Sequence, residues 1–339
     1  MNAGVKFSLA IVATLAVASC RGDIRSAGDS NMVRVRAVLM PYVNYAPLHV
    51  AAAEGMFAKR GIDIELVRMP DPEPALPLLL SGSVDVLPGH ASPGVLNAIA
   101  RGQRIRAVAQ KHHAATGCSG VGIVVGPSFF DEWTPGHGRP PVRRISINRQ
   151  GAMLYFVHTA LTRLGLDLDS LETVLIPHAA EAAAFADGAI DAALSGDPFL
   201  SDLLAKDQAR LLIGVEDVLP GIEFAQVYFG ERLLDREPAV GVRFLAAWLE
   251  AANLLAEGPT PENLERVAAA TGQPVETLSA VCWPFAATDG TIDFNQIDRF
   301  QRWLLEEGLI DRFVSQDELI DNAPLEAIRR SALDETVSR

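Results

Sequence analysis

The chain has 339 residues, of which 49% are hydrophobic and 21% are charged, and this composition excludes disorder over most of its length. Its 42 acidic side chains outnumber the 29 lysines and arginines, which gives a formal net charge of -13. A surface of this sign repels phosphate backbones, so we expect no nucleic-acid partner, although a few cationic groups in a cleft would still hold an anionic ligand.

The N-terminus has the layout of an export signal. Lys6 is followed by an apolar stretch, residues 7–18, that is shorter than the roughly 20 residues needed to span a bilayer. We therefore assign residues 1–19 to a signal peptide. The motif Val17-Ala18-Ser19-Cys20 resembles the lipobox of bacterial lipoproteins, which implies cleavage before Cys20 and lipidation of its sulfur. An ordinary signal peptide with an incidental Cys20 is the alternative. Residues 20–32 are then the lipidated cysteine and a polar, flexible tether.

From Val33 onward, short apolar runs alternate with helical patterns, which predicts βα units and mainly parallel sheets covered by helices. Gly82 and Gly188 are placed to end helices in the left-handed conformation, each three residues before an aspartate that starts a buried strand. Pro77 interrupts a helix that we expect to start late or to be kinked. Residues 127–143 read as a surface excursion, and the pattern is almost continuously helical after about residue 238.

Cysteine and histidine spacing gives no metal site. Cys118 and Cys282 either pair in an oxidising compartment or are two small buried residues, and their spacing leaves both readings open. His112 and His113 are adjacent, so on a strand they point to opposite faces and cannot chelate one ion. Because the chain also lacks a nucleophile elbow and a phosphate-binding glycine-rich loop, we expect no metal, no cofactor and no catalytic residues.

Five motifs occur in an order that resembles a known family. They are Asn44–Ala51 with Glu54–Glu65, Leu79–Val86, Phe185–Ala193, Gly196–Phe199 and Gly308–Ile310. Together they resemble the periplasmic solute-binding proteins of the nitrate, sulfonate, taurine and thiamine-precursor importers, over nearly the whole mature chain. The resemblance implies a type II binding-protein fold, in which two α/β lobes each hold a mostly parallel sheet flanked by helices, with a helical C-terminal extension. We expect lobe one to comprise residues 33–112 and 226–339, and lobe two residues 113–225.

The ligand of such a fold should lie at the carboxyl ends of the strands, where the following helices present backbone N–H groups. This rule and the resemblance select five loops or strand ends as ligand contacts: Tyr42, Asn44 and Tyr45; His90, Ala91 and Ser92; Asn148, Arg149, Gln150 and Gly151; Asp197 and Phe199; and Gln226. Ser92 and Asp197 are also expected to cap helices. Arg149 would pair with a carboxylate, sulfonate or phosphate, because its guanidinium binds such groups in a bidentate manner.

The resemblance implies a binding function without catalysis. We expect the lipid-anchored, monomeric subunit of an ATP-driven importer, on the periplasmic or cell-surface side of the membrane. Its partners would be a small organic solute and a permease with its ATPase. The solute class stays open, because Arg149 favours a sulfonate or carboxylate, whereas the Asn44 motif favours a pyrimidine-like ring. The alternative is a fold-related enzyme of thiamine-pyrimidine or menaquinone-precursor metabolism, although three scattered cysteines cannot supply the cysteine-rich iron motif of the pyrimidine-forming type.

Overall fold

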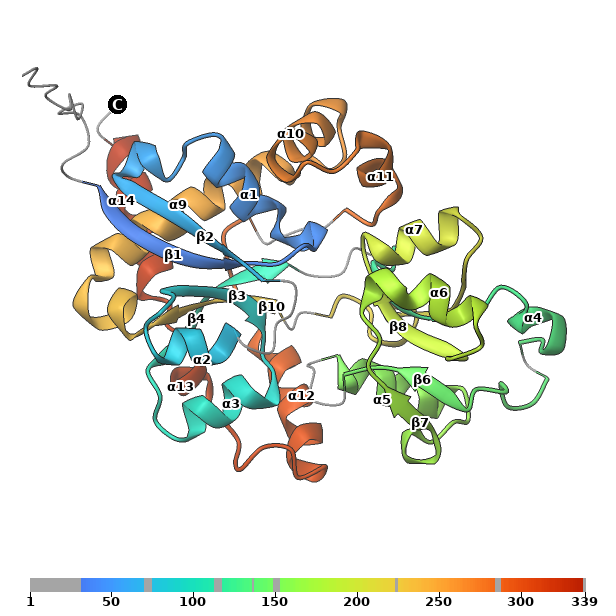
Figure 1. Cartoon of the computed structure of the whole chain (residues 1–339). Coiled ribbons are helices and arrows are strands. Elements are labelled where there is room, and N and C mark those ends of the chain that lie inside the picture. The colour runs from blue at the N-terminus through green and yellow to red at the C-terminus, as the bar shows by residue number, and fades with distance from the viewer. Residues whose placement is uncertain are drawn as a thin grey trace, which may run out of the picture.

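The computed structural model describes residues 32–69, 75–112, 118–135, 137–148, 153–222, 225–283 and 288–337. These residues form two lobes, each built on a five-stranded sheet flanked by helices (Figure 1). The first lobe contains the N-terminal strands and the C-terminal helices, drawn in blue, cyan, orange and red, and the second lobe is green and yellow. The predicted two-lobe α/β fold with a helical C-terminal region is therefore confirmed.

The first sheet has the strand order β2-β1-β3-β10-β4. Its strands are β1 (Val33–Leu39), β2 (Ile62–Arg68), β3 (Val86–His90), β4 (Ile105–His112) and β10 (Ala225–Gly230). Strand β1 pairs in parallel with β2 and β3, whereas β10 runs antiparallel to β3 and β4. The reversed strand is the one that returns from the second lobe, so it enters the sheet from its carboxyl edge.

The second sheet repeats this plan with the order β7-β6-β8-β5-β9. Its strands are β5 (Val121–Val125), β6 (Arg144–Ser146), β7 (Glu172–Val174), β8 (Ala192–Gly196) and β9 (Arg210–Gly214). Strand β6 is parallel to β7 and β8, and β5, the first strand after the chain leaves lobe one, is antiparallel to β8 and β9. Each sheet is thus mainly parallel, as predicted, with one reversed strand that comes from the other lobe.

Helices cover both sheets. Lobe one holds α1 (Ala46–Ala53), α2 (Ala75–Leu80) and α3 (Pro93–Ala100), and lobe two holds α4 (Phe129–Glu132), α5 (Leu154–Arg163), α6 (Glu181–Ala186), α7 (Phe199–Ala205) and α8 (Val215–Val218). The C-terminal helices are α9 (Pro238–Leu255), α10 (Pro261–Thr271), α11 (Val275–Ala280), α12 (Phe294–Glu306), α13 (Gln316–Leu319) and α14 (Ala323–Val337). Short 3-10 turns span Val43–Tyr45, Ala58–Arg60, Leu168–Ser170 and His178–Ala180, and a π-helical turn spans Arg232–Arg236. Pro77 lies in the first turn of α2, where a missing N–H removes no helical hydrogen bond.

The hydrophobic cores follow the two lobes. Lobe one has one large core, in which the ring of Phe244 of α9 lies 5.8 Å from the ring of Phe229 of β10, and both residues are fully buried. Lobe two has a separate cluster on each face of its sheet, one around Phe156 of α5 and one around Phe185 of α6. None of the helices in the described parts of the chain is long and apolar enough to cross a membrane.

In lobe one, the predicted Gly-x-Val-Asp turn has a structural role. Gly82 has φ +70° and ends its helix in the left-handed conformation. Asp85 is buried and its Oδ2 accepts a hydrogen bond from the backbone N–H of Arg36, with an N···O distance of 2.8 Å. The Arg36 side chain in turn donates to the carbonyl of Gly82 at 2.7 Å. The turn between α2 and β3 is thereby tied to the neighbouring strand β1.

Lobe two repeats this arrangement. Gly188 has φ +64°, and Oδ2 of Asp191 accepts from the backbone N–H groups of Arg143 and Arg144, at 2.8 Å each. The Arg144 guanidinium donates to the carbonyl of Ala189 at 2.9 Å. The two turns are therefore equivalent connections in two similarly built lobes, as the sequence predicts.

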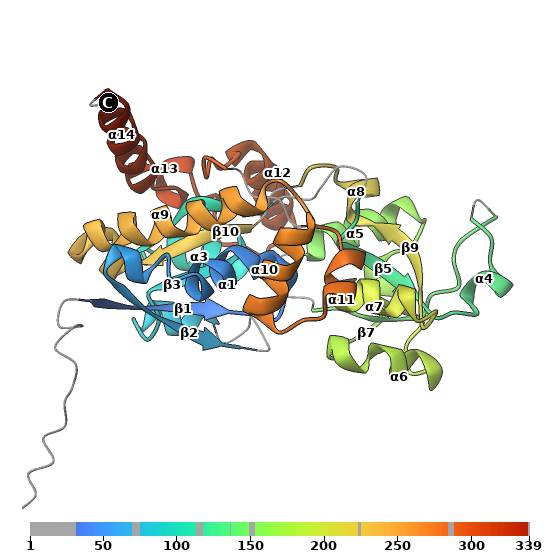
Figure 2. The same cartoon turned by 90° about the horizontal axis from the view of Figure 1, so that it is seen from above.

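The C-terminal helices of lobe one touch lobe two on two flanks: α11 lies beside α7, and α12 lies beside α5 (Figures 1 and 2). On the α12 flank, the Trp303 ring lies 5.2 Å from the rings of both Tyr155 and His158. On the α11 flank, Cys118 and Cys282 form a disulfide with a Cα–Cα distance of 5.7 Å. The sequence did not decide whether these cysteines pair. The disulfide joins the start of lobe two to the segment after α11.

Candidate functional site

The loop after β1 reaches the second lobe through Tyr42. The centroid of the Tyr42 ring lies 6.2 Å from the His178 ring and 6.5 Å from the Phe199 ring, edge-on to both. His178 and Phe199 are stacked on each other with centroids 5.4 Å apart. These three residues, the aromatic trio, bring side chains of both lobes into contact at the carboxyl ends of the strands.

His178 is held in place by a buried carboxylate. Its Nδ1 lies 2.8 Å from Oε1 of Glu181, which has no exposed surface. A carboxylate can only accept, so Nδ1 carries the proton in this pair. The contact fixes the imidazole ring against Phe199, and the lobe-two half of the aromatic trio is therefore rigidly presented.

On the lobe-one side, Lys111 at the end of β4 interacts with the loop after β1. Its Nζ donates to Oδ1 of Asn44 at 2.6 Å and lies 3.7 Å from the centroid of the Tyr45 ring. The Tyr45 hydroxyl donates to the carbonyl of Pro88 at 2.5 Å, which fixes the ring beneath the amine. Burial lowers the pKa of Lys111 well below its ordinary value, because the charged form loses hydration.

Asn44 also connects Lys111 to the histidines. Its Nδ2 lies 3.2 Å from Nε2 of His112. Because Oδ1 of Asn44 accepts from Lys111, its Nδ2 must be the donor, so Nε2 of His112 accepts and is unprotonated. The His112 ring lies 6.4 Å from the ring of His90 on β3. Burial, followed by the nearby charge of Lys111, lowers the pKa of His90 to about 3, so this histidine is neutral near pH 7.

A β-bulge explains why Lys111 points toward this loop. Ala225 pairs with His112 and Gln226 pairs with Gln110, so Lys111 is an extra residue between two pairs. Such a bulge redirects the side chain that it contains, and bulges are frequent beside functional sites. Gln226 itself is fully buried. Its Oε1 accepts from the Tyr228 hydroxyl at 2.8 Å, and within the described residues its Nε2 has no hydrogen-bond partner.

Asp197 joins the first turn of α7 to the disulfide. Its Oδ1 accepts from the backbone N–H and the hydroxyl of Ser201 at 3.1 and 2.6 Å, which is the capping role expected from the sequence. Its Oδ2 accepts from the backbone N–H of Cys282 at 2.8 Å. Burial raises the pKa of Asp197, and these hydrogen bonds oppose the shift. The peptide bond between Asp197 and Pro198 is cis.

The comparisons with known proteins agree with this architecture. Residues 28–272, more than half of the chain, match the model of the NMT1-like family. The chain belongs to the NMT1-like family. No curated protein is similar enough in sequence to this family member to count as a match.

Solved structures with the same fold as this NMT1-like protein include binding proteins and an enzyme. The ligand-binding component of an ABC-type import system from Staphylococcus aureus, with zinc bound, gives a TM-score of 0.72 at 16% identity, covering 86% of this chain and 98% of that one. The alkanesulfonate-binding protein SsuA from Xanthomonas axonopodis pv. citri, bound to MOPS, gives 0.65 at 19% identity, covering 86% and 97%. The desulfurization enzyme DSZB gives 0.66 at 18% identity, covering 88% and 99%. At these identities the likeness establishes the fold, and the family resemblance predicted from the motifs is confirmed.

The predicted ligand contacts of this NMT1-like chain are only partly brought together. Tyr42 and Phe199 belong to the aromatic trio, and Asn44 and His90 lie in the polar group around Lys111 and His112. The contact of these residues with a ligand stays a prediction.

The other predicted contacts are buried, act as caps or lie elsewhere. Tyr45, Ala91 and Gln226 have at most 2% exposed surface. Ser92 accepts from the N–H of Val95 at 3.3 Å and caps α3, as expected. Asn148 follows the end of β6. Four predicted residues lie outside the described parts of the chain: Cys20, Arg149, Gln150 and Gly151.

Sequence reasoning missed four residues that the structure places at this site: Lys111, His112, His178 and Glu181. His112 was considered only as a metal ligand, together with His113, and Lys111 was not considered, because no local sequence pattern indicates the bulge that redirects Lys111. For His178 and Glu181 a signal was available, because both lie in the connection after β7, at the same sheet edge as the other selected loops.

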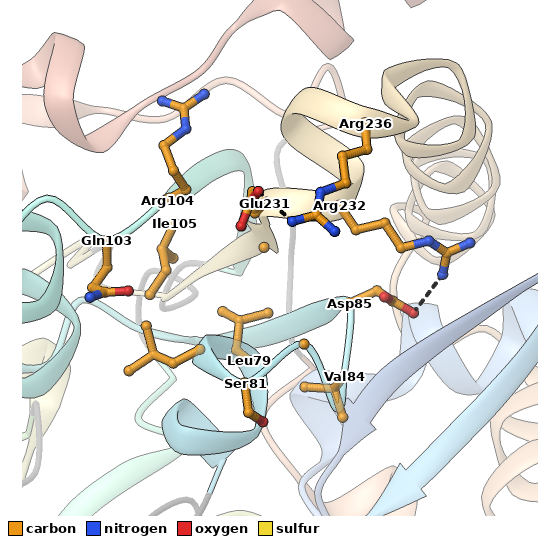
Figure 3. A pocket seen from close by; sticks show the side chains of 13 residues that line it. Leu79, Ser81, Val84, Asp85, Gln103, Arg104, Ile105, Glu231, Arg232 and Arg236 are labelled. Carbon is orange, nitrogen blue, oxygen red and sulfur yellow. Dashed lines mark hydrogen bonds and ion pairs between the residues drawn. The ribbon is translucent and has the colours of Figure 1, made fainter.

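Two surface hollows lie at the opposite edge of the first sheet, near the amino ends of its parallel strands, and neither lies between the lobes. One, of about 400 Å³, is lined by Arg34, Arg36, Glu65 and Arg232. The other, of about 280 Å³, is shown in Figure 3. Their cations are neutralised locally, as Arg232 lies 3.2 Å from Asp85 and Arg236 lies 2.6 Å from Glu231. No group of three or more metal-ligating side chains is positioned to hold an ion in the described residues.

Proposed function

We propose that this chain is an extracytoplasmic solute-binding protein that captures a small organic solute between its lobes and delivers it to the permease of an ATP-driven importer. The observation that carries the proposal is the aromatic trio, in which Tyr42 of lobe one meets His178 and Phe199 of lobe two. A ligand that contacts both lobes stabilises the closed arrangement through its higher affinity for that state. The shared fold with the import component and with the alkanesulfonate-binding protein supports this function.

The proposal includes attachment to the membrane through Cys20 alone. The export signal and the lipobox-like motif support it, with residues 20–32 as the tether. The protein would then be a monomer on the outer side of the membrane, with the permease and its ATPase as partners and without a cofactor.

Capture without chemistry is favoured over an enzymatic role, although the fold is shared with the enzyme DSZB. Cys118 and Cys282 are joined in the disulfide, so neither is available as a thiolate nucleophile. In the polar group of lobe one, Asn44 is hydrogen-bonded both to the Lys111 amine and to the His112 imidazole. The rival activities, on thiamine-pyrimidine or menaquinone precursors, predict a changed product, whereas capture predicts that the solute is recovered unaltered.

A thermal-shift screen of alkanesulfonates, aromatic carboxylates and pyrimidines tests the function. A compound at 100 times its dissociation constant stabilises the folded state by about 2.7 kcal/mol and raises the melting temperature accordingly. Chromatography of each stabilising compound after incubation separates capture from conversion. If no compound of the three classes raises the melting temperature, the proposal fails for these solutes.

Variants locate the binding site. Tyr42→Ala should weaken a binding compound by at least about fivefold, because truncation of a central aromatic contact costs more than about 1 kcal/mol. Phe129→Ala is the matched control, since Phe129 packs against Phe130 and Trp133 in the 127–143 excursion, away from the trio. Equal losses of affinity in the two variants would contradict a site between the lobes.

A further inference from the structure

Lys111 is a buried amine that has no carboxylate partner in the part of the chain that the structure describes. Its side chain is 1% exposed, and its Nζ contacts are Oδ1 of Asn44 at 2.6 Å and the Tyr45 ring at 3.7 Å from the centroid. None of the ion pairs that link described residues includes Lys111, whereas the buried Asp85 of the same lobe lies close to two arginines. The amine is therefore the one ionisable group of this region whose charge is not balanced within the described structure.

Among the described residues, the groups around Lys111 provide dipoles but no negative charge. The titratable side chains near it are Tyr45 of the loop after β1, His90 of β3 and His112 of β4. Burial raises the pKa of Tyr45, so its hydroxyl stays neutral, and burial keeps His90 neutral as well. The acid of the neighbouring lobe-two site, Glu181, is engaged by His178. An ammonium has three N–H donors, and Asn44 accepts only one of them.

The location of the amine suggests what would balance it. Lys111 and Asn44 lie at the carboxyl edge of the first sheet, and Asn44 is two residues from Tyr42, which contacts lobe two. A carboxylate or sulfonate placed there would supply both the missing acceptors and the missing negative charge. An opposite charge within about 4 to 6 Å favours the ammonium, so the bound anion would reverse the effect of burial.

We propose that the acidic group of an anionic solute binds beside Lys111 and that its capture takes up one proton from solvent at the Lys111 amine. The proposal rests on the proposed function and adds to it a proton-coupled selection of anions. In the free protein burial favours the neutral amine, and in the complex the amine is an ammonium paired with the solute anion, so one proton and one negative charge enter together. The dissociation constant should therefore rise by up to tenfold per pH unit between the pKa of the amine in the free protein and its pKa in the complex.

The lysine content makes a direct test practical. The sequence contains four lysines, Lys6, Lys59, Lys111 and Lys206, and Lys6 lies in the export signal. Protein labelled with [13Cε]lysine should give one Cε signal per lysine, and Lys111→Met assigns the buried one. Because burial lowers the pKa of Lys111, its signal should titrate well below the ordinary lysine value of about 10.4. A Lys111 signal that titrates at that ordinary value overturns the proposal before any ligand is added.

A matched pair of probes tests the coupling to an anion. Benzoate and benzamide, each at up to about 10 mM, have the same ring, but only benzoate carries a charge. Benzoate should return the Lys111 Cε signal to its protonated position at a pH where the free protein has a neutral amine, and benzamide should not. If benzoate leaves the signal in the neutral position, the proposal is overturned, whether or not the compound binds.

Variants separate this result from a failure of the proposed function. Lys111→Met should lose the pH dependence of benzoate affinity, whereas Lys206→Met, an exposed lysine, should retain it. Equal pH dependence in the two variants overturns proton coupling at Lys111. If benzamide or a neutral pyrimidine binds as tightly as benzoate without moving the Lys111 signal, solute capture stands and the coupling fails. The proposed function fails only when no class of compound binds.

Discussion

The paired turns at Asp85 and Asp191 provide a prediction with an internal control, because the same local arrangement has a different electrostatic setting in each lobe. Asp85 is 2% exposed, and its Oδ2 lies 2.8 Å from the backbone nitrogen of Arg36, 3.2 Å from Nη1 of Arg232 and 3.6 Å from Nε of Arg36. Asp191 is only half-buried, and its carboxylate accepts from two backbone N–H groups.

The expected costs follow from these contacts. Removal of one member of a buried ion pair costs about 3 to 5 kcal/mol. The two arginine side chains are 34% and 29% exposed and regain water, so we expect Asp85→Ala to cost about 3 kcal/mol, at the lower end of that range. Asp191→Ala leaves two backbone donors without a protein acceptor at a partly hydrated site and should cost about 2 kcal/mol.

Asparagine variants separate charge from hydrogen bonding, because asparagine keeps an acceptor oxygen and lacks the charge. Asp85→Asn should still lower the free energy of unfolding by about 2 kcal/mol, which is most of the loss expected for Asp85→Ala. Asp191→Asn should lose less than half of the stability that Asp191→Ala loses. Hydrogen exchange measured by mass spectrometry on peptides from β1 and β3, and separately from β6 and β8, reports each lobe, since two lobes need not unfold in one step. The reasoning is refuted if both aspartates give the same pattern in the alanine and asparagine variants.

Three further predictions concern the disulfide, Lys111 and the anchor. The Cys118–Cys282 disulfide joins residues that are 164 positions apart in the sequence, and a loop of this length restricts the unfolded chain strongly. Replacement of both cysteines by serine should lower the free energy of unfolding by up to about 5 kcal/mol, and an unchanged midpoint of guanidinium unfolding would contradict this. Because burial lowers the pKa of Lys111 in the folded state, the unfolded chain binds more protons between that pKa and about 10.4, so stability should rise with pH in this window. Between pH 7 and 9 the wild type should therefore gain stability relative to Lys111→Met, by at most about 1.4 kcal/mol per pH unit. If the difference in unfolding free energy between the two proteins does not change with pH, Lys111 does not contribute to the pH dependence. Cys20→Ser should move the exported protein from the membrane fraction to the soluble fraction, and retention in the membrane fraction would argue against lipidation.

Much of the fold could be predicted from the sequence because its signals are local. The apolar runs predicted the strands, Gly82 and Gly188 have the left-handed conformation that their positions require, and Ser92 caps α3 as expected. The predicted alternation of strands and helices also gave the mainly parallel sheets. The antiparallel direction of β5 and β10 was not predicted. It results from the passage of the chain between the lobes and not from the residue types in these two strands.

The candidate site was harder to predict because its contacts depend on long-range register. The position of Lys111 is set by a one-residue bulge against β10, more than 100 residues away along the chain, and local residue types do not encode it. His178 gains its role from Glu181 and from the stacking partner Phe199, which the sequence does not place together. The pairing of Cys118 with Cys282 likewise depends on the packing of α11 against the second lobe.

The disulfide also has a topological consequence. Together with the backbone it closes a covalent ring from Cys118 to Cys282, and this ring contains all five strands of the second sheet, the return strand β10 and helices α9 to α11. A protease that cuts once anywhere inside the ring therefore produces two chain segments that stay attached to each other. Such a nicked molecule would run as one band on a gel without reductant and as two bands with it, and a single cut in an exposed loop such as 127–143 would not release a fragment into the surroundings.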